Sequence, residues 1–169
     1  MTKKEEITKV NYKFSNIDFK EAASIGDLYT FLNGKIDEYV IELEKIRRNR
    51  NLKRLNTRDY IATVIAGKGN KYAAWGTCFD ILTVIHPILV KKLEKLGKIG
   101  EKNILEEGQH CKNIIGKCSE IKVRNALFTK ENICENEEAI KNIEFTPATR
   151  PRTSELVPMC FNCEFIFIK

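Results

Sequence analysis

The sequence predicts a domain that contains both α-helices and β-strands, because both helical and strand patterns occur along it. Residues 19–50 carry apolar side chains at helical spacing, interrupted near Asn33-Gly34, which fits one long helix or two shorter ones. Residues 60–66 are a β-rich apolar run, and residues 72–77 can return as a second strand after a Gly-containing turn over residues 67–70. This stretch therefore predicts a β-hairpin.

Further elements follow the hairpin. Pro87 interrupts the apolar period of residues 79–96, so we expect a helix that begins at Pro87, with His86 in the preceding loop. Residues 118–128 predict another helix, and residues 143–146 another strand. Residues 1–18 are polar and are expected to be an irregular leader, and residues 147–157 a basic, Pro-containing loop.

Composition narrows the class of protein. The chain has 169 residues, 43% of them hydrophobic and 31% charged, which is ordinary for a globular domain. The net charge of +6 is compatible with a polyanionic partner. Residues 1–6 are charged with no apolar run behind them, and no stretch reaches the ~18 apolar residues of a membrane span. We therefore expect no signal peptide and no membrane partner, and a cytoplasmic location or delivery into a target cell's cytoplasm.

The sequence has two cysteine motifs that point to a metal site. Cys118 opens a Cys-x-Glu motif, and Cys160 and Cys163 form a Pro-x-Cys-x-x-Cys motif 42 positions further on. Without a predicted secretory context, cysteine pairs are better explained by metal binding than by disulfides. Three thiolates are expected to bind one Zn²⁺ and to leave its fourth tetrahedral position open for water, whose pKa the metal lowers towards neutrality. The other cysteines show no such pattern.

Glu120, two residues after Cys118, is the predicted catalytic acid/base. A zinc deaminase needs a carboxylate that does not bind the metal and that moves protons between the water and the base. The alternative is a binding module with a structural zinc, closed by a fourth ligand. His110 or Cys111, just upstream of Cys118, would supply that ligand. A helical interaction protein without metal is a third class.

The chain also resembles a known family. Residues 85–89 (Ile-His-Pro-Ile-Leu), 116–120 (Gly-Lys-Cys-Ser-Glu), 150–152 (Arg-Pro-Arg) and 158–163 (Pro-Met-Cys-Phe-Asn-Cys) are similar to motifs of the YwqJ-like deaminases. These belong to the cytidine deaminase-like superfamily and occur mostly as toxin domains of bacterial polymorphic secretion systems. The resemblance covers the chain from about Asp59 to its end. Met159 departs from the superfamily, in which the proline usually precedes the cysteine directly.

The resemblance implies a cytidine deaminase-like three-layer α/β/α sandwich with a small mixed sheet, Zn²⁺ as cofactor, and hydrolytic removal of an amino group from a nucleobase. Residues 55–169 would form the deaminase-like domain, and residues 1–54 an N-terminal leader and helical extension. Residues 165–168 would complete the sheet as a terminal strand. Cys118, Cys160 and Cys163 match the family's metal ligands, and Glu120 its proton shuttle. A toxin of this kind would have a cognate immunity protein as a partner.

The sequence also offers candidate residues for contacts with a substrate. A nucleic-acid substrate would need basic residues along the strand and an aromatic ring on which a base can stack. The charge could come from Arg150, Arg152 and the basic segment 47–54, and the ring could be that of Trp75 or Tyr72. Two further candidates for substrate contacts are His86 and Ser119. The alternative is that these charged side chains are solvated at the surface and that these aromatic rings fill the core. A free nucleotide therefore remains an alternative substrate, and neither the base nor the type of nucleic acid is specified.

Overall fold

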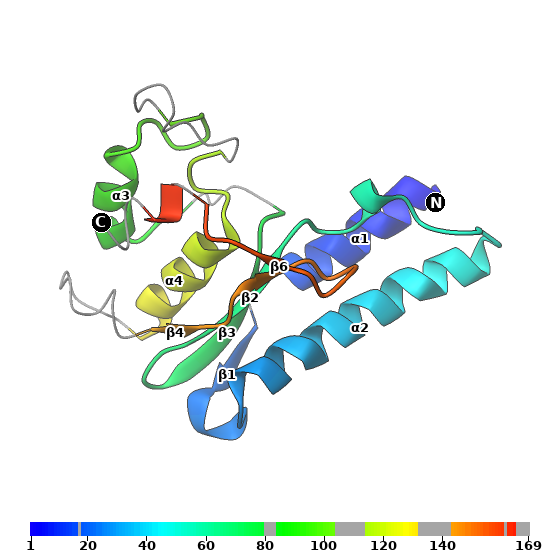
Figure 1. Cartoon of the computed structure of the whole chain (residues 1–169), viewed down its shortest axis with the longest axis horizontal. Coiled ribbons are helices and arrows are strands. Elements are labelled where there is room, and N and C mark those ends of the chain that lie inside the picture. The colour runs from blue at the N-terminus through cyan, green and yellow to red at the C-terminus, as the bar shows by residue number, and fades with distance from the viewer. Residues whose placement is uncertain (17, 80–83, 104–113, 132–142, 161, 165–169) are drawn as a thin grey trace.

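The computed structural model describes residues 1–16, 18–79, 84–103, 114–131, 143–160 and 162–164. Its elements are α1 (Lys3–Ser15), β1 (Phe19–Glu21), η1 (Ala22–Ser24), α2 (Leu28–Asn49), η2 (Thr57–Asp59), β2 (Val64–Lys68), β3 (Tyr72–Thr77), α3 (Pro87–Glu94), α4 (Ser119–Lys130), β4 (Glu144–Phe145), β5 (Ala148–Thr149) and β6 (Leu156–Val157). Figure 1 shows their arrangement around the central strands. No helix among the described residues is long and apolar enough to cross a membrane.

The predicted hairpin forms the centre of the sheet. The strands β2 and β3 pair in antiparallel register, with Ile65 opposite Gly76. β1 lies on the outer side of β3, whereas β4 and β5 pair one after the other with β2, and β6 pairs with β5. Every pairing between described residues is antiparallel, so the expected mixed sheet is wrong for this part of the chain.

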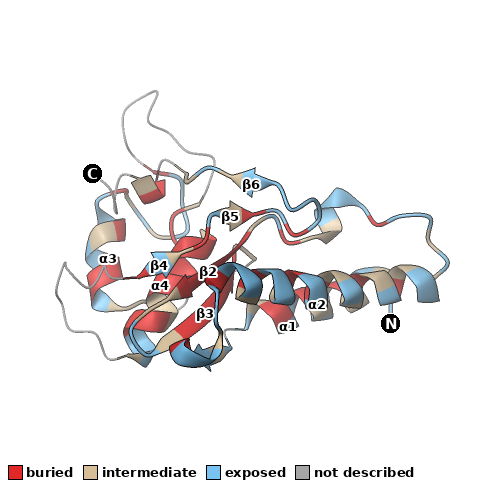
Figure 2. Cartoon of the chain, turned by 60° about the horizontal axis from the view of Figure 1, so that its bottom comes forward, coloured by how far each residue is buried: buried red, intermediate tan, exposed pale blue. Residues whose placement is uncertain are grey.

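Helices cover both faces of the sheet, and the α/β prediction is confirmed. On one face, α1 and α2 bury apolar side chains against Val64, Ala66 and Trp75. On the other face, α4 and the start of α3 pack against Ile65 and Ala74. This alternation follows from the period of a strand, whose successive side chains point to opposite faces. The strands β2 and β3 are consequently buried between two helical layers (Figure 2).

The leader expected to be irregular is instead the helix α1. Thr2 and Glu5 form a capping box, in which each side chain accepts a hydrogen bond from the other residue's backbone N–H. Ile7 and Phe14 bury the inner face of the helix. The segment 1–54 also supplies β1 and the single long helix α2, so it contributes both a strand and a helical layer to the sandwich.

Other boundaries differ in detail from the predictions. The helix α3 begins at Pro87 as expected, and β4 lies within the predicted strand. The segment 147–157 is not simply a loop, because β5 and β6 form a short hairpin within it. The terminal strand expected over residues 165–168 lies outside the described residues.

Candidate metal centre

The first cysteine lies immediately before the helix α4. Gly116 has a φ of +88°, a left-handed conformation that favours glycine, and the chain turns there towards Cys118. Cys118 is the N-cap residue of α4, with extended backbone angles, and Glu120 lies in the first turn of the helix. The entry into one helix therefore positions both groups of the Cys-x-Glu motif.

The second cysteine pair lies on a single turn near the end of the chain. The backbone N–H of Glu164 donates to the carbonyl of Cys160 over 3.0 Å, which closes the turn that carries Cys160 and Cys163. Between these cysteines, the buried side chain of Asn162 accepts a 2.8 Å hydrogen bond from Asn103 Nδ2. This bond fixes the turn to the segment that follows α3.

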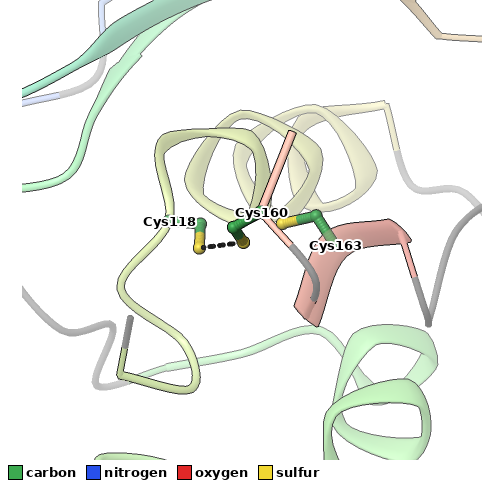
Figure 3. Close-up of side chains that lie close together, drawn as sticks. All are labelled: Cys118, Cys160 and Cys163. Carbon is green, nitrogen blue, oxygen red and sulfur yellow. Dashed lines mark hydrogen bonds between the residues drawn. The ribbon is translucent and has the colours of Figure 1, made fainter. Parts of the chain in front are cut away.

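The three sulfur atoms converge. The Sγ atoms of Cys118, Cys160 and Cys163 all lie within 4.8 Å of one another (Figure 3). A tetrahedral Zn²⁺ with Zn–S distances of ~2.3 Å has its sulfur ligands about 3.8 Å apart, so the cluster fits this ion. The chemistry of the donors also fits, because thiolate is a preferred zinc ligand. The three cysteines thus form a cluster that could hold a metal ion, and its donor set is consistent with zinc.

Without a metal ion, the surroundings of the three thiols disfavour their deprotonation. A hydrogen bond with Cys160 raises the pKa of Cys118, and hydrogen bonds with Cys118 and Cys160 raise the pKa of Cys163 well above its ordinary value. Burial adds to both effects. Three adjacent thiolates would repel one another in a partly desolvated site, and a divalent cation reverses this balance. The cluster is therefore arranged for a metal rather than for a free thiolate nucleophile.

Glu120 is buried beside this cluster. Its side chain is 7% exposed, and Oε2 has no hydrogen-bond partner among the described residues. Burial raises the pKa of Glu120 to about 7, although the positive charge of Arg124 opposes the rise. Arg124, one turn further along α4, is itself buried and lies 4.5 Å from the centre of the Phe145 ring. The carboxyl group is thus desolvated and able to accept or donate a proton.

Close packing fixes the position of α4 on the sheet. A Cβ atom at Gly76 would lie 2.9 Å from the carbonyl oxygen of Ser119 and would collide with the side chain of Val123. A Cβ atom at Gly67 would also collide with Val123. Gly76 therefore allows the first turn of α4, which carries Glu120, to approach the strands closely, and Gly67 leaves room for Val123 further along the helix.

A cavity of about 390 Å³ opens next to the cluster. Its lining includes the three clustered cysteines together with Ser119, Glu120 and Arg150. Ser119 is buried at the start of α4, whereas Arg150 is exposed at the start of the turn between β5 and β6. The predicted ligands, the predicted acid/base and two of the predicted substrate contacts therefore share one cavity.

Three other candidate substrate contacts lie away from this lining. Trp75 is 2% exposed, packs against Phe14 on the face covered by α1, and donates from Nε1 to the Phe14 carbonyl. His86 is the N-cap of α3, where Nδ1 accepts a hydrogen bond from the backbone of Ile88 over 3.3 Å. Arg152 is exposed in the β5–β6 turn. Trp75 thus serves the core, and His86 caps a helix.

Among the lining residues that sequence reasoning did not predict as site residues, three carry a hydroxyl, thiol or amine group: Thr63, Cys78 and Lys117. Thr63 donates its backbone N–H to Cys78 Sγ over 3.3 Å, which ties the chain before β2 to the chain after β3. Lys117 precedes Cys118, and this adjacency was the one available signal. His110 and Cys111, the candidate fourth ligands of a structural zinc site, lie outside the described residues.

No family model matches the chain, and neither the curated proteins nor the solved structures contain a significant match. The function of the protein is therefore inferred from its own residues and their geometry.

Proposed function

We propose that this chain is a zinc-dependent hydrolytic deaminase that acts on a nucleobase. The observation that carries the proposal is the convergence of three cysteine sulfurs beside a buried carboxyl group that has no described partner for one oxygen. Both features line one cavity of about 390 Å³, which is large enough for a base and its sugar. A structural zinc site needs neither the cavity nor the buried carboxyl group.

Each residue of the centre has a distinct role. Cys118, Cys160 and Cys163 would hold the metal, and Zn²⁺ bound there would supply an activated water for hydrolysis. Glu120 would act as the proton shuttle, and would carry one proton of the attacking water to the ring nitrogen and the other to the departing amine. Burial suits Glu120 to this work, because a carboxyl group with a pKa of about 7 exists in both protonation states near neutral pH.

The surroundings of the centre exclude bulk water from one side. Behind the three cysteines lie Leu93, Leu96, Ile115 and Ile121, all buried in the same apolar cluster as Cys163. Ser119, at the start of α4, offers a hydroxyl group to a bound base. An apolar wall with a few directed polar groups is typical of sites that bind small aromatic ligands.

The resemblance to YwqJ-like deaminases supports the same chemistry and adds a biological expectation. As a toxin domain, the protein would inhibit the growth of cells that lack a matching immunity protein. Expression from a tightly controlled promoter, with and without Glu120→Gln, tests this expectation. Growth inhibition that persists in the variant would contradict a toxic effect caused by deamination.

The direct test of the proposed function combines metal analysis with a substrate survey. Elemental analysis should give one zinc per chain. Nucleosides released from single- and double-stranded DNA and RNA, and from free nucleotides, should then show replacement of an amino group by oxygen in one base, as measured by mass spectrometry. Zinc without conversion of any base would favour the alternative of a binding module with a structural zinc site.

A further inference from the structure

We propose that the base enters the cavity as part of a single-stranded polynucleotide, whose backbone crosses the β5–β6 turn and continues over a basic surface at the end of α2. This inference rests on the proposed deaminase function, because it specifies the molecule that presents the base. The basic surface consists of four exposed residues, Arg48, Lys53, Arg54 and Arg58.

The charged residues that line the cavity favour an anionic ligand. Lys117 and Arg150 both line it, and Glu120 is the one carboxylate among the described lining residues. Glu120 is buried on the side of the cysteines, whereas Arg150 is exposed. A ligand with an uncharged base at the inner end and a phosphate at the outer end matches this distribution of charge.

The guanidinium group of Arg150 is available to such a phosphate. Its described ionic partner is Glu155, at an Nε–Oε2 distance of 3.6 Å, and the two side chains are 48% and 68% exposed. An exposed pair at this distance stabilises the protein by at most ~1 kcal/mol. A phosphate group offers shorter, bidentate hydrogen bonds to arginine, so it can displace Glu155.

The same turn leads from the cavity to the basic surface. Figure 2 shows the turn between β5 and β6 beside the chain that follows the end of α2. Tyr60, directly after η2, has a pKa that burial, Glu44 and Asp59 raise and that nearby Arg152 and Arg47 lower. Arg152 therefore brings a positive charge from the turn close to Tyr60, where Glu44 and Asp59 also lie.

The residues of the basic surface differ in their ion pairing from other basic residues of α2 and from the basic residue that follows the helix. Along the helix, Lys35, Lys45 and Arg47 each pair with a glutamate three residues away, and Arg50 pairs with Glu6. None of the four residues of the basic surface forms an ion pair with a described residue. Uncompensated cations of this kind bind polyanions and release counterions, which gives an affinity that depends strongly on salt.

These positions distinguish a polynucleotide from a free nucleotide. The single phosphate of a free nucleotide can contact Arg150 and Lys117 at the cavity, but it has no group that extends across the turn. A strand has further phosphates for Arg152 and the basic surface, and the half-buried ring of Tyr60 offers its bases a stacking partner. The extent of the basic surface is therefore the observation that favours the polymer.

The test is binding of fluorescent single-stranded DNA and RNA of mixed sequence to the zinc-loaded full chain, measured by anisotropy over a salt series. Glu120→Gln is used as the background, so that binding is measured without turnover. The triple variant Lys53→Gln, Arg54→Gln and Arg152→Gln should bind at least tenfold more weakly. Its salt slope should fall by about 2, at ~0.7 per lost phosphate contact for single strands.

The matched control removes three charges elsewhere. Lys20, Lys71 and Lys95 are exposed on other elements, and their replacement by Gln should change affinity less than twofold. Equal losses in both triple variants would overturn the proposed path, because they would show a response to net charge alone. Equal affinity for a nucleoside monophosphate and for the strand would also overturn it, in favour of a free nucleotide.

The outcomes separate this inference from the proposed function. A protein that holds no zinc or converts no base would contradict the proposed deaminase function. The measured binding of the strand would still test the path over the basic surface. Conversely, conversion of a base in single strands at a rate that the triple change does not alter would overturn the polynucleotide path and leave the deaminase intact.

Discussion

Cys118 Sγ lies 3.3 Å from Cys160 Sγ, although the two residues are 42 positions apart in the sequence. The first is held at the entrance to α4 and the second on the turn near the end of the chain. Cys163 completes the cluster from the buried side. The close approach of these elements means that a metal bound here would also link α4 to the end of the chain.

Loss of any ligand should therefore remove zinc and lower stability together. Replacement of Cys118, Cys160 or Cys163 by Ser should reduce the bound zinc from one per chain to near zero, because metal binding is coupled to folding in such sites. Elemental analysis and thermal unfolding measure the two effects. Cys78→Ser is the matched control, since Cys78 lines the same cavity but lies outside the cluster. A loss of zinc in this control equal to that of the three variants would contradict the assignment.

The contact between α4 and the strands should be sensitive to one added methyl group. Gly76→Ala places a Cβ atom against the Ser119 carbonyl and the Val123 side chain. Overpacking of this kind costs about 1–3 kcal/mol, so the free energy of unfolding should fall by that amount and zinc should bind more weakly. Denaturant unfolding and a competitive chelator assay measure both quantities.

Gly34→Ala provides the control for that variant. Gly34 lies inside α2, and a Cβ atom there would meet nothing within 4 Å. Because alanine favours the helix over glycine, this change should raise the free energy of unfolding by about 0.5–1 kcal/mol. A Gly76→Ala protein as stable as the Gly34→Ala protein would contradict the tight approach of α4 to the sheet.

Tyr39 connects α1 and α2 to the central hairpin, and its hydroxyl group should be important for stability. It donates to Asn11 Oδ1 over 2.7 Å and accepts from the backbone N–H of Ile61 over 2.9 Å, in a fully buried position. Tyr39→Phe leaves both groups without this partner, at a cost of about 1–3 kcal/mol. Tyr29→Phe on the exposed face of α2 should change stability by less than ~0.5 kcal/mol. Equal effects in denaturant unfolding would refute the buried bridge.

Local patterns made the centre predictable. Apolar spacing predicted a helix from Cys118, which is the N-cap of α4, and the start of α3 followed from His86-Pro87, because proline favours the first position of a helix. The short spacings within Cys-x-Glu and Cys-x-x-Cys keep the residues of each motif close together. The meeting of the two motifs was a chemical inference from the ligand set, and the cluster bears it out.

Features that depend on tertiary contacts were harder to predict. The helix α1 is largely polar, and its signals were the Thr2–Glu5 capping box and the spacing of Ile7 and Phe14. The strands β5 and β6 have two residues each, too few for a periodic pattern, and they exist because β2 offers an edge. The burial of Trp75 depends on which face of the hairpin α1 covers, and the sequence of the hairpin does not specify that face.

Conversion of a base by the zinc-loaded protein, compared between the wild type and Glu120→Gln, tests the central claim most directly. Both proteins should hold one zinc and unfold at similar temperatures. The wild type should convert one kind of base, and the variant should be slower by about 10²- to 10⁴-fold, the usual contribution of a general acid/base. Glu94→Gln, an exposed change on α3, should keep the wild-type rate. Conversion by Glu120→Gln at the wild-type rate would contradict the assignment of Glu120 and, with it, the proposed mechanism.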